Sequence, residues 1–523
     1  MRNTRVLQVC GTGSGVGKSV IVAGLCRIFL QDGFTVCPFK AQNMALNSFV
    51  TKERREIGRA QASQAAACRI EPSVDMNPIL IKPTSDIGSQ VIVRGRPIGN
   101  MRAAEYIKHK KNLKNVVWKA FARLKHKYEI VVIEGAGSPA EINLKKHDLV
   151  NMKMAQHANA PVILVGDIDK GGVFAWIVGT LELLTKKERS MIKGVIINKF
   201  RGDKRLLASG ISFLEKRTKI KVLGVVPYFS RRSGIPSQMG NDIQIPEEDS
   251  ASLDERIRHN KLDKNRKNID IAVIRLPYMS NFTDFDALEK EEDVVLRYVK
   301  DAAELKKPDL IIIPGTKNTI FDMRYVKTSG LASRIDALVN SNSSTFLLGI
   351  CGGYQILGRK ISDKYHLESS SKEIEGLGIL PICTRLGKNK VLAQVKARDM
   401  TSGIEISGYE IHHGVSKYER NCGPFFEVLE HNGRAARYPD GFRRKDGRVF
   451  GTYIHGLFDT DIFRRAFLNR IRQRKGWQPL PEKNCFDQDR EFDKLARLLR
   501  ENIDMKSLYR IVNPHTNCNM SVS

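Results

Sequence analysis

The sequence predicts an α/β protein with two sheet domains in tandem. In the first half, short apolar runs alternate with helical patterns, and a glycine-rich turn follows the first run. In the second half, another apolar run ends on a cysteine flanked by glycines. Such alternation is typical of a mostly parallel sheet covered on both faces by helices. We therefore expect ligands at the carboxyl ends of the strands.

The expected strands divide the chain into two units. They are the apolar runs at residues 6–10, 35–38, 130–133, 162–165, 195–197, 222–225, 269–276, 310–313, 346–350 and 449–454. Residues 246–268 are rich in charge and poor in apolar side chains, which indicates a linker. The expected domains are therefore residues 1–245 and 269–470, with a helical, basic extension over 471–523.

The glycine-rich turn after the first strand has the pattern of a phosphate-binding loop. Residues 11–19 are GTGSGVGKS and lead into a helical pattern, so backbone N–H groups can cradle phosphates there. Lys18 is expected to reach the β- and γ-phosphates, and the Ser19 hydroxyl to ligate Mg²⁺. The loop residues expected to bind ATP are Thr12, Gly13, Ser14, Gly15, Val16, Gly17, Lys18 and Ser19.

Two further strand ends complete the expected nucleotide site. Glu134 directly follows the apolar run 130–133 and is expected to hold Mg²⁺, directly or through water. Asn198 follows a later strand and is expected to contact the nucleotide. A guanine-reading loop would carry aspartate where Arg201 stands, so adenine is the better prediction. Gly13 occupies the place of the additional lysine found in partitioning ATPases, which argues against a dimerising switch.

The cysteine of the second half, Cys351, has the setting of a nucleophile elbow. It ends an apolar strand and precedes a helical pattern, and small neighbours at Gly349 and Gly353 leave room for a strained turn. His455, after the apolar run 449–454, is the candidate base. The alternative for Cys351 is a buried structural thiol, since free cysteine is often buried.

Composition bounds the functional classes. The chain has 523 residues, a formal charge of +29 and nine cysteines without Cys-x-x-Cys pairs, which predicts reduced thiols and a cytoplasmic location. No apolar run is long enough for a membrane span, so no membrane partner is expected. The positive charge suggests a nucleic-acid partner, but the sequence contains no recognised nucleic-acid-binding motif. Nucleic acid is therefore not expected as a partner. The lysine-rich stretch 108–127 is interpreted as a solvated helix face.

With both motifs and their order established, the chain resembles the cobyric acid synthase family of glutamine-dependent enzymes in cobalamin biosynthesis. The resemblance extends from about residue 8 to about residue 465. It includes the strings PFKAQNM at 38–44, EGAGSPAE at 134–141, DIDKGGVF at 167–174, SNFTDFD at 280–286 and GYEIH at 408–412.

The resemblance implies a fold and a reaction. The fold is a P-loop NTPase-like, mostly parallel sheet domain similar to dethiobiotin synthetase, followed by a class I glutamine amidotransferase-like α/β domain. The reaction is amidation of the b, d, e and g carboxylates of adenosylcobyrinic acid a,c-diamide, which gives adenosylcobyric acid. Each amide consumes one ATP, with Mg²⁺, and one ammonia derived from glutamine.

The resemblance also implies roles for residues of the second domain. Cys351 would attack the glutamine carboxamide, while His455 takes the thiol proton and later protonates the departing ammonia. The N–H of Gly352 and one from the turn at Gly315 and Thr316 would hold the oxyanion. Full amidotransferase triads have glutamate two residues after the histidine, where this chain has Leu457. Another group must therefore orient His455, and a backbone carbonyl is the candidate.

The resemblance also implies roles for residues that would contact the phosphates of ATP or the corrinoid substrate. Lys18, Lys40 and Mg²⁺ on Ser19 and Glu134 would neutralise the charge that develops during phosphoryl transfer. Three residues are candidates for contact with the corrinoid, and each has a structural alternative. The alternative for Lys82 is an ordinary surface lysine. Asp148 could instead contact Mg²⁺ or cap a helix, and His412 could be a structural histidine whose hydrogen bonds are made within the protein.

Two other functions compete with this interpretation. One is cobyrinic acid a,c-diamide synthase, the related enzyme that acts earlier in the same pathway. The other is a P-loop regulatory ATPase with a vestigial amidotransferase domain. The strings at 40–44 and 280–286 favour cobyric acid synthase, and the intact Cys351, His455 and Lys18 count against a vestigial domain.

Overall fold

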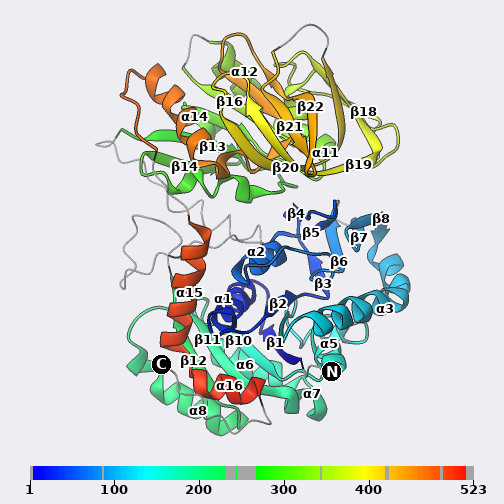
Figure 1. Cartoon of the computed structure of the whole chain (residues 1–523), viewed down its shortest axis with the longest axis vertical. Coiled ribbons are helices and arrows are strands. Elements are labelled where there is room, and N and C mark those ends of the chain that lie inside the picture. The colour runs from blue at the N-terminus through cyan, green and yellow to red at the C-terminus, as the bar shows by residue number, and fades with distance from the viewer. Residues whose placement is uncertain are drawn as a thin grey trace.

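The computed structural model consists of two lobes stacked along the long axis of the molecule (Figure 1). It describes residues 4–84, 88–229, 243, 267–341, 344–418, 423–482 and 487–513. One lobe contains the blue, cyan and first green elements together with the red C-terminal helices (Figure 1). The other contains the later green, yellow and orange elements (Figure 1). Most of the expected linker, residues 246–266, lies outside the described residues.

The first lobe is built on a six-stranded parallel sheet with the order β12-β11-β10-β1-β9-β2. Its strands are β1 (Arg5–Gly11), β2 (Val36–Phe39), β9 (Ile130–Glu134), β10 (Val162–Asp167), β11 (Ile192–Phe200) and β12 (Val222–Pro227). All six expected strands of the first half are present, so the predicted parallel α/β sheet is confirmed. Because β9 and β10 flank β1, their last residues meet the turn that follows β1.

Helices cover both faces of this sheet, and its strands are therefore buried on both sides. Beside α1 (Lys18–Gln31), which starts at the glycine-rich turn, lies α2 (Arg59–Ala67). The remaining helices are α3 (Ala103–Lys127), α4 (Ile142–Lys145), α5 (Met152–Ala158), α6 (Val173–Glu182), α7 (Lys186–Met191), the 3₁₀ turn η1 (Lys204–Leu207) and α8 (Ala208–Thr218). The lysine-rich stretch belongs to α3, whose outward residues are exposed, as a solvated helix face requires.

Residues between β2 and α3 form two small sheets that the sequence did not predict. Their strands are β3 (Gln42–Met44), β4 (Ser48–Val50), β5 (Glu56–Gly58), β6 (Ile79–Pro83), β7 (Gly88–Val93) and β8 (Arg96–Arg102). One sheet has the order β3-β6-β7-β8, and the other is the β4-β5 hairpin. Three of these strands, β3, β4 and β5, have only three residues and are too short to show a clear alternation of apolar and polar side chains. The β4-β5 hairpin lies on the side of this lobe that faces the other lobe (Figure 1).

The second lobe contains the parallel sheet expected from its sequence. Its order is β14-β13-β15-β16-β24-β23, in which only β23 runs antiparallel to its neighbour. The strands are β13 (Ile269–Ile274), β14 (Val294–Val299), β15 (Leu310–Ile313), β16 (Phe346–Ile350), β23 (Phe442–Arg443) and β24 (Val449–Thr452). Around them lie η2 (Phe282–Phe285), η3 (Leu288–Lys290), α10 (Ala302–Leu305), α11 (Thr319–Thr328), α12 (Leu331–Asn340), α13 (Gly352–Leu357) and η4 (Leu457–Asp459).

A second, mostly antiparallel sheet of this lobe was not predicted. It consists of β17 (Lys360–Ser362), β18 (Glu373–Glu375), β19 (Ile382–Asp399), β20 (Glu405–Tyr418), β21 (Phe426–His431), β22 (Arg434–Asp440) and β25 (Ile454–His455). The exposed side chains of the long strand β19 are mostly charged, and those of β20 are mixed, so neither strand forms a continuous apolar run. The expected run 449–454 divides between the two sheets, as β24 and β25.

The C-terminal helices return to the first lobe. Helix α14 (Asp461–Arg474) packs on the second lobe, but α15 (Gln488–Asn502) lies along α1, and α16 (Met505–Val512) follows. The approach is close, because a Cβ on Gly24 of α1 would lie 2.3 Å from Leu499 Cδ1. Arg27 of α1 also makes ion pairs with Asp489 and Asp493, at 2.5 and 2.9 Å. The end of the chain therefore contributes to the core around α1.

Among the described helices, none has both the length and the apolar character needed to cross a bilayer.

Candidate functional site

Cys351 lies in a strained turn between β16 and α13. Its backbone has φ 52° and ψ −106°, which is unusual for a residue with a side chain. The neighbouring glycines are required, because a Cβ on Gly353 would lie 1.9 Å from the carbonyl oxygen of Ile313. A Cβ on Gly349 would lie 2.7 Å from the carbonyl group of Gly353. The thiol is 6% exposed at the carboxyl end of the sheet, as a nucleophile elbow would place it.

His455 lies within hydrogen-bonding reach of Cys351 and is oriented by a carboxylate from a distant part of the chain. The distance from its Nδ1 to Asp284 Oδ2 is 2.6 Å, and the N–H of Gly456 donates to Asp284 Oδ1 at 3.0 Å. The expectation that a backbone carbonyl orients His455 is therefore wrong. Asp284 belongs to η2, and the string at 280–286 was the signal that could have identified it.

The charges around His455 determine its protonation. Burial alone would lower its pKa, but the negative charges of Asp284 and of a Cys351 thiolate outweigh burial and raise the pKa to about 10. The ring of Tyr409 stacks on the imidazole with 5.2 Å between ring centroids. The geometry therefore favours a charged imidazolium beside the Cys351 sulfur, an arrangement that activates the cysteine of cysteine–histidine nucleophiles.

The backbone around Cys351 provides candidates for an oxyanion hole. Gly352 is the first residue of α13, where an N–H has no partner inside the helix. A Cβ on Gly352 would lie 3.0 Å from the backbone nitrogen of Thr316, so the turn after β15 contacts the elbow. Gly315 lies close to His455, since a Cβ placed on this glycine would lie 2.9 Å from His455 Cε1. The structure thus brings together all three predicted oxyanion residues.

Asn281 of the second lobe lies between His455 and the first lobe. Asn281 Nδ2 lies 3.4 Å from His455 Nε2, and Asn281 Oδ1 accepts a hydrogen bond of 2.9 Å from the N–H of Ser48 in β4. Next to it, the side chain of Asn47 accepts a bond of 3.2 Å from the N–H of Phe282. The β4-β5 hairpin is therefore linked to His455 through Asn281, a contact that the sequence did not predict.

The expected phosphate site lies at the carboxyl end of β1. Lys18 Nζ donates to the carbonyls of Gly13 and Gly137, at 2.7 and 3.1 Å, and so lies over its own loop. The Ser19 hydroxyl donates to Glu134 Oε1 at 2.8 Å, and Lys40 Nζ lies 2.8 Å from the same oxygen. The structure therefore places these four predicted residues in one cluster.

Glu134 is charged in this cluster. Burial would raise its pKa, but Lys40 and hydrogen bonds from Gln64 and Ser19 lower it overall. One carboxylate and one hydroxyl beside a phosphate loop fit Mg²⁺, which takes few protein ligands and completes its shell with phosphates and water. Within the described ranges, no group of three or more His, Cys, Asp or Glu side chains could hold a metal by itself.

The loop residues 12–19 adopt the conformation that their glycines allow. Gly15 has φ +69° and Gly17 has φ +96°, both in the left-handed region. Asn198 supports the loop, since its Nδ2 donates to the carbonyl of Val16 at 2.9 Å. A Cβ on Gly17 would lie 2.2 Å from that nitrogen, so the contact itself requires glycine.

Two residues beside the loop were missed. Lys199 Nζ lies 2.8 Å from Asp167 Oδ2 and 2.7 Å from the carbonyl of Gly15. Asp167 ends the buried strand β10 in the same way that Glu134 ends β9, so its position was the available signal. The first strand is thus flanked by a carboxylate on each side.

The three candidate substrate residues have different environments. Lys82 is 3% exposed and lies 2.6 Å from Glu56, so it is not an ordinary surface lysine. Asp148 accepts bonds of 2.9, 2.9 and 3.0 Å from three backbone N–H groups just before and within the first turn of α5, as a capping residue does. His412 Nδ1 lies 2.7 Å from the carbonyl of Gly414, and its ring stacks on Tyr453. Its buried Nε2 makes no hydrogen bond within the described chain, but it lies 4.0 Å from Glu410 Oε1.

A nucleotide-binding α/β domain joined to a glutamine amidotransferase domain is the class of protein that this fold and these two centres define. Comparison with known families agrees. Residues 7–239 match the sequence model of the CobQ/CobB/MinD/ParA nucleotide binding domain. Residues 270–463 match that of the CobB/CobQ-like glutamine amidotransferase domain.

Curated relatives identify the family. Proteins named cobyric acid synthase are 48% identical in Clostridium botulinum (strain Loch Maree / Type A3), over 97% of this chain and 99% of the relative. The identity is 49% in Clostridium novyi (strain NT), over 98% of each chain, and 50% in Streptococcus sanguinis (strain SK36), over 97% of this chain and 99% of the relative. The chain belongs to the cobyric acid synthase family.

Proposed function

We propose that this chain catalyses the ATP- and glutamine-dependent amidation of the b, d, e and g carboxylates of adenosylcobyrinic acid a,c-diamide. The product would be adenosylcobyric acid, an intermediate of cobalamin biosynthesis. Membership in the cobyric acid synthase family supports the reaction class. The presence of a glutaminase-type centre and a phosphate-binding centre in one chain supports the division into two half-reactions.

In the first half-reaction, the Cys351 thiolate attacks the carboxamide carbon of glutamine. The N–H groups of Gly352 and of the Gly315–Thr316 turn stabilise the oxyanion. The imidazolium of His455 donates its Nε2 proton to the departing ammonia, while Asp284 keeps Nδ1 protonated and the ring oriented. Water, deprotonated by His455, then hydrolyses the thioester and releases glutamate.

In the second half-reaction, a carboxylate oxygen of the substrate attacks the γ-phosphorus of ATP and ADP leaves. The resulting acyl phosphate is attacked by ammonia, phosphate leaves, and one proton is lost from the nitrogen. Lys18 and Lys40 lie where they can neutralise the charge on the phosphoryl oxygens. Asn198 and the glycines hold the loop in shape for the phosphates.

Ser19 and Glu134 would hold Mg²⁺, with phosphate oxygens completing its shell. The bound ion would supply charge stabilisation for phosphoryl transfer. Lys40 pairs with the Glu134 carboxylate in the structure, so its positive charge would act in the same part of the site.

The contact between the lobes supports a shielded transfer of ammonia. Cys351 and His455 are almost fully buried, and Asn281 and Ser48 close the space beside His455 Nε2 from the side of the first lobe. Ammonia released there would leave toward the first lobe rather than directly into bulk water. This matters because ammonia that is protonated in bulk water is no longer a nucleophile.

The single observation that carries the proposal is the buried Cys351–His455–Asp284 centre, which Asn281 links to the hairpin of the nucleotide-binding lobe. The test is incubation with ATP, Mg²⁺, glutamine and the a,c-diamide corrinoid, followed by mass spectrometry. Four added amides per corrinoid are expected. Amidation of only the a and c carboxylates of cobyrinic acid would instead identify the related diamide synthase, and hydrolysis of ATP without amides would contradict the proposal.

A further inference from the structure

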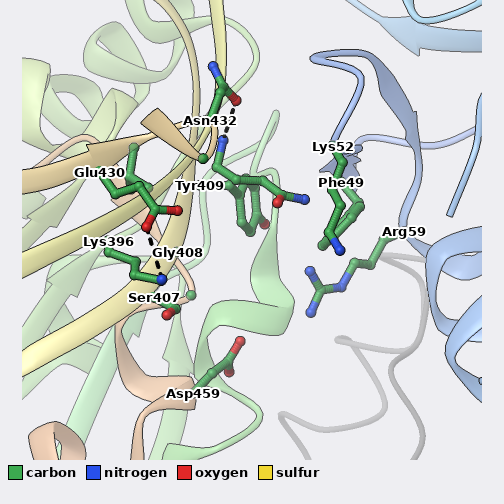
Figure 2. Close-up of a pocket in the computed structure, with 14 residues that line it drawn as sticks. Phe49, Lys52, Arg59, Lys396, Ser407, Gly408, Tyr409, Glu430, Asn432 and Asp459 are labelled. Carbon is green, nitrogen blue, oxygen red and sulfur yellow. Dashed lines mark hydrogen bonds and ion pairs between the residues drawn. The ribbon is translucent and has the colours of Figure 1, made fainter. Parts of the chain in front are cut away.

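A cavity of about 520 Å³ lies between the lobes, beside the histidine of the glutaminase centre. One wall comes from β4 and the start of α2 in the first lobe, through Phe49 and Arg59. The opposite wall comes from β20 and η4 of the second lobe, through Tyr409 and Asp459 (Figure 2). Neither the nucleophile Cys351 nor any residue of the phosphate loop lines it, although Tyr409 and Gly456, which contact His455 and Asp284, do.

Arg59 is the cation in this cavity that has no carboxylate at ion-pair distance among the described residues, although the charge of Asp459 acts on it from the opposite wall. The other two cations that line it are engaged, since Lys52 lies 2.6 Å from Glu71 and Lys396 lies 2.9 Å from Glu430. Within the described ranges, the Arg59 guanidinium makes no ion pair and no side-chain hydrogen bond. It lies 5.5 Å from the Phe49 ring centroid and 6.0 Å from that of Tyr409. Two aromatic rings thus hold a planar cation toward the cavity.

The opposite wall offers hydrogen-bonding groups. The hydroxyl of Tyr409, a residue 4% exposed, has no hydrogen-bond partner in the described part of the chain. Asp459 points into the cavity from the second lobe (Figure 2) and makes no ion pair among the described residues. A buried polar group without a partner is costly, so these groups indicate a polar ligand. A carboxylate matches Arg59, and an amide or ammonium N–H matches Asp459.

Helix α2 connects this cavity to the phosphate site. Arg59 is its first residue, and Gln64, on the same helix, donates to Glu134 Oε2 at 2.5 Å. Five residues of helix correspond to a rise of about 7.5 Å. A ligand with several carboxylates on its rim can therefore present one to the phosphate site while another reaches Arg59.

We propose that this cavity binds a carboxylate arm of the corrinoid that is not the one being amidated, with Arg59 as its partner and Asp459 accepting from a neighbouring amide. The proposal rests on the proposed function and names the substrate subsite. The corrinoid periphery bears both carboxylates and amides, which are the two groups that the cavity matches. Glutamine also bears a carboxylate and an N–H donor, but its carboxamide must reach Cys351, which is absent from the cavity wall.

The test measures corrinoid binding and turnover in substituted full-length chains. Arg59→Gln removes the charge, Arg59→Lys keeps it without the planar fork, and Asp459→Asn alters the opposite wall. Arg69→Gln is the matched control, because Arg69 follows the same helix but pairs with Asp489 at 2.9 Å, outside the cavity. Equilibrium dialysis of the a,c-diamide corrinoid without ATP gives its Kd. Assays with ammonium salts as the nitrogen source give its KM without the glutaminase centre.

Arg59→Gln is expected to raise the Kd and KM for the corrinoid about tenfold or more, the loss typical of one charge-assisted hydrogen bond. The Kd of Arg59→Lys for the corrinoid should fall between those of wild type and Arg59→Gln. The Kd of Arg69→Gln should equal that of wild type. Asp459→Asn should weaken corrinoid binding as an independent check from the other lobe.

Three results would overturn the proposal. The first is an unchanged corrinoid Kd in Arg59→Gln and Asp459→Asn, with both variants folded as judged by circular dichroism. The second is a rise in KM for glutamine alone, which would assign the cavity to the amino acid. The third is a wild-type chain that does not bind the corrinoid. If wild type binds the corrinoid through Arg59 but forms no amides, the proposed reaction fails while the subsite stands.

Discussion

Replacing Asp284 by asparagine tests whether a carboxylate far away in the sequence completes the glutaminase centre. Asparagine keeps the shape of the side chain and can still accept the hydrogen bond from the N–H of Gly456. It removes the negative charge 2.6 Å from His455 Nδ1 and can present an N–H₂ to that nitrogen instead. The substitution therefore affects the charge and the tautomer of His455 rather than its packing.

The structure allows the size of the effect to be estimated. A hydrogen bond to a charged group contributes about 1.5–3 kcal/mol, which corresponds to about a 10- to 150-fold fall in kcat for glutamine hydrolysis. If asparagine also stabilises the wrong tautomer, the fall approaches the factor of about 10⁴ seen for the same change in a serine protease triad. We expect a loss within this range and little change in the KM for glutamine.

The pH dependence provides a second measure with a defined sign. In the folded protein the pKa of His455 is raised from 6.5 to about 10, since the charges of Asp284 and a Cys351 thiolate outweigh burial. The charged histidine therefore stabilises the fold fully below pH 6.5, and this contribution is lost as pH rises through about 10. Asp284→Asn should move the alkaline limb of glutaminase activity to lower pH.

The assay is glutamate release by the full-length chain, compared with amidation supported by ammonium salts. Asp284→Asn should lose the first activity and retain the second, because added ammonia bypasses Cys351. Asp336→Asn is a suitable control, since this exposed carboxylate lies on α12 of the same lobe. Glutaminase activity of Asp284→Asn within twofold of wild type, with an unshifted alkaline limb, would refute the assigned role.

Three further predictions concern the other centres and the junction between the lobes. Cys351→Ala should abolish the use of glutamine while amidation with ammonium salts persists, because only the first half-reaction needs the thiol. Lys18→Ala should abolish amidation with either nitrogen source, as measured by mass spectrometry of the corrinoid, because the phosphoryl transfer needs its charge. Glu56→Gln should destabilise the chain by about 3–5 kcal/mol in urea unfolding, because it leaves Lys82 and Lys390, 2.6 and 2.5 Å away, buried without their counter-ion.

Each of these has a result that contradicts it. Loss of ammonia-dependent synthesis in Cys351→Ala would show that the centres are not separable. Synthesis by Lys18→Ala from ammonium salts would remove the phosphate role of that lysine. An unchanged unfolding midpoint in Glu56→Gln would show that the buried ion pairs contribute nothing to stability.

The parallel sheets could be predicted because their strands are continuous apolar runs. All six strands of the first sheet were expected, since a strand buried on both faces carries apolar side chains throughout. The long strands β19 and β20 were missed because exposed polar and charged residues interrupt their apolar ones. The packing of α15 on α1 was also missed, because a contact between residues more than 450 positions apart has no local signal.

The two reaction centres differ in how far the sequence determined them. Cys351 and the phosphate loop lie in local motifs whose spacing reflects their geometry, so they could be proposed from the sequence. Asp284 is 171 residues from His455, and Asn47 contacts the second lobe from 235 residues away. Such partners are determined by how the lobes and sheets assemble.

The most direct measurement follows the nitrogen from one centre to the other. The chain is supplied with ATP, Mg²⁺, the corrinoid and glutamine labelled with ¹⁵N at the amide, together with an excess of unlabelled ammonium at neutral pH. If Cys351 releases ammonia that reaches the activated carboxylate without mixing with the solvent, the new amides should carry ¹⁵N. Amides that carry the unlabelled nitrogen of the solution would contradict a coupled, shielded transfer between the two lobes.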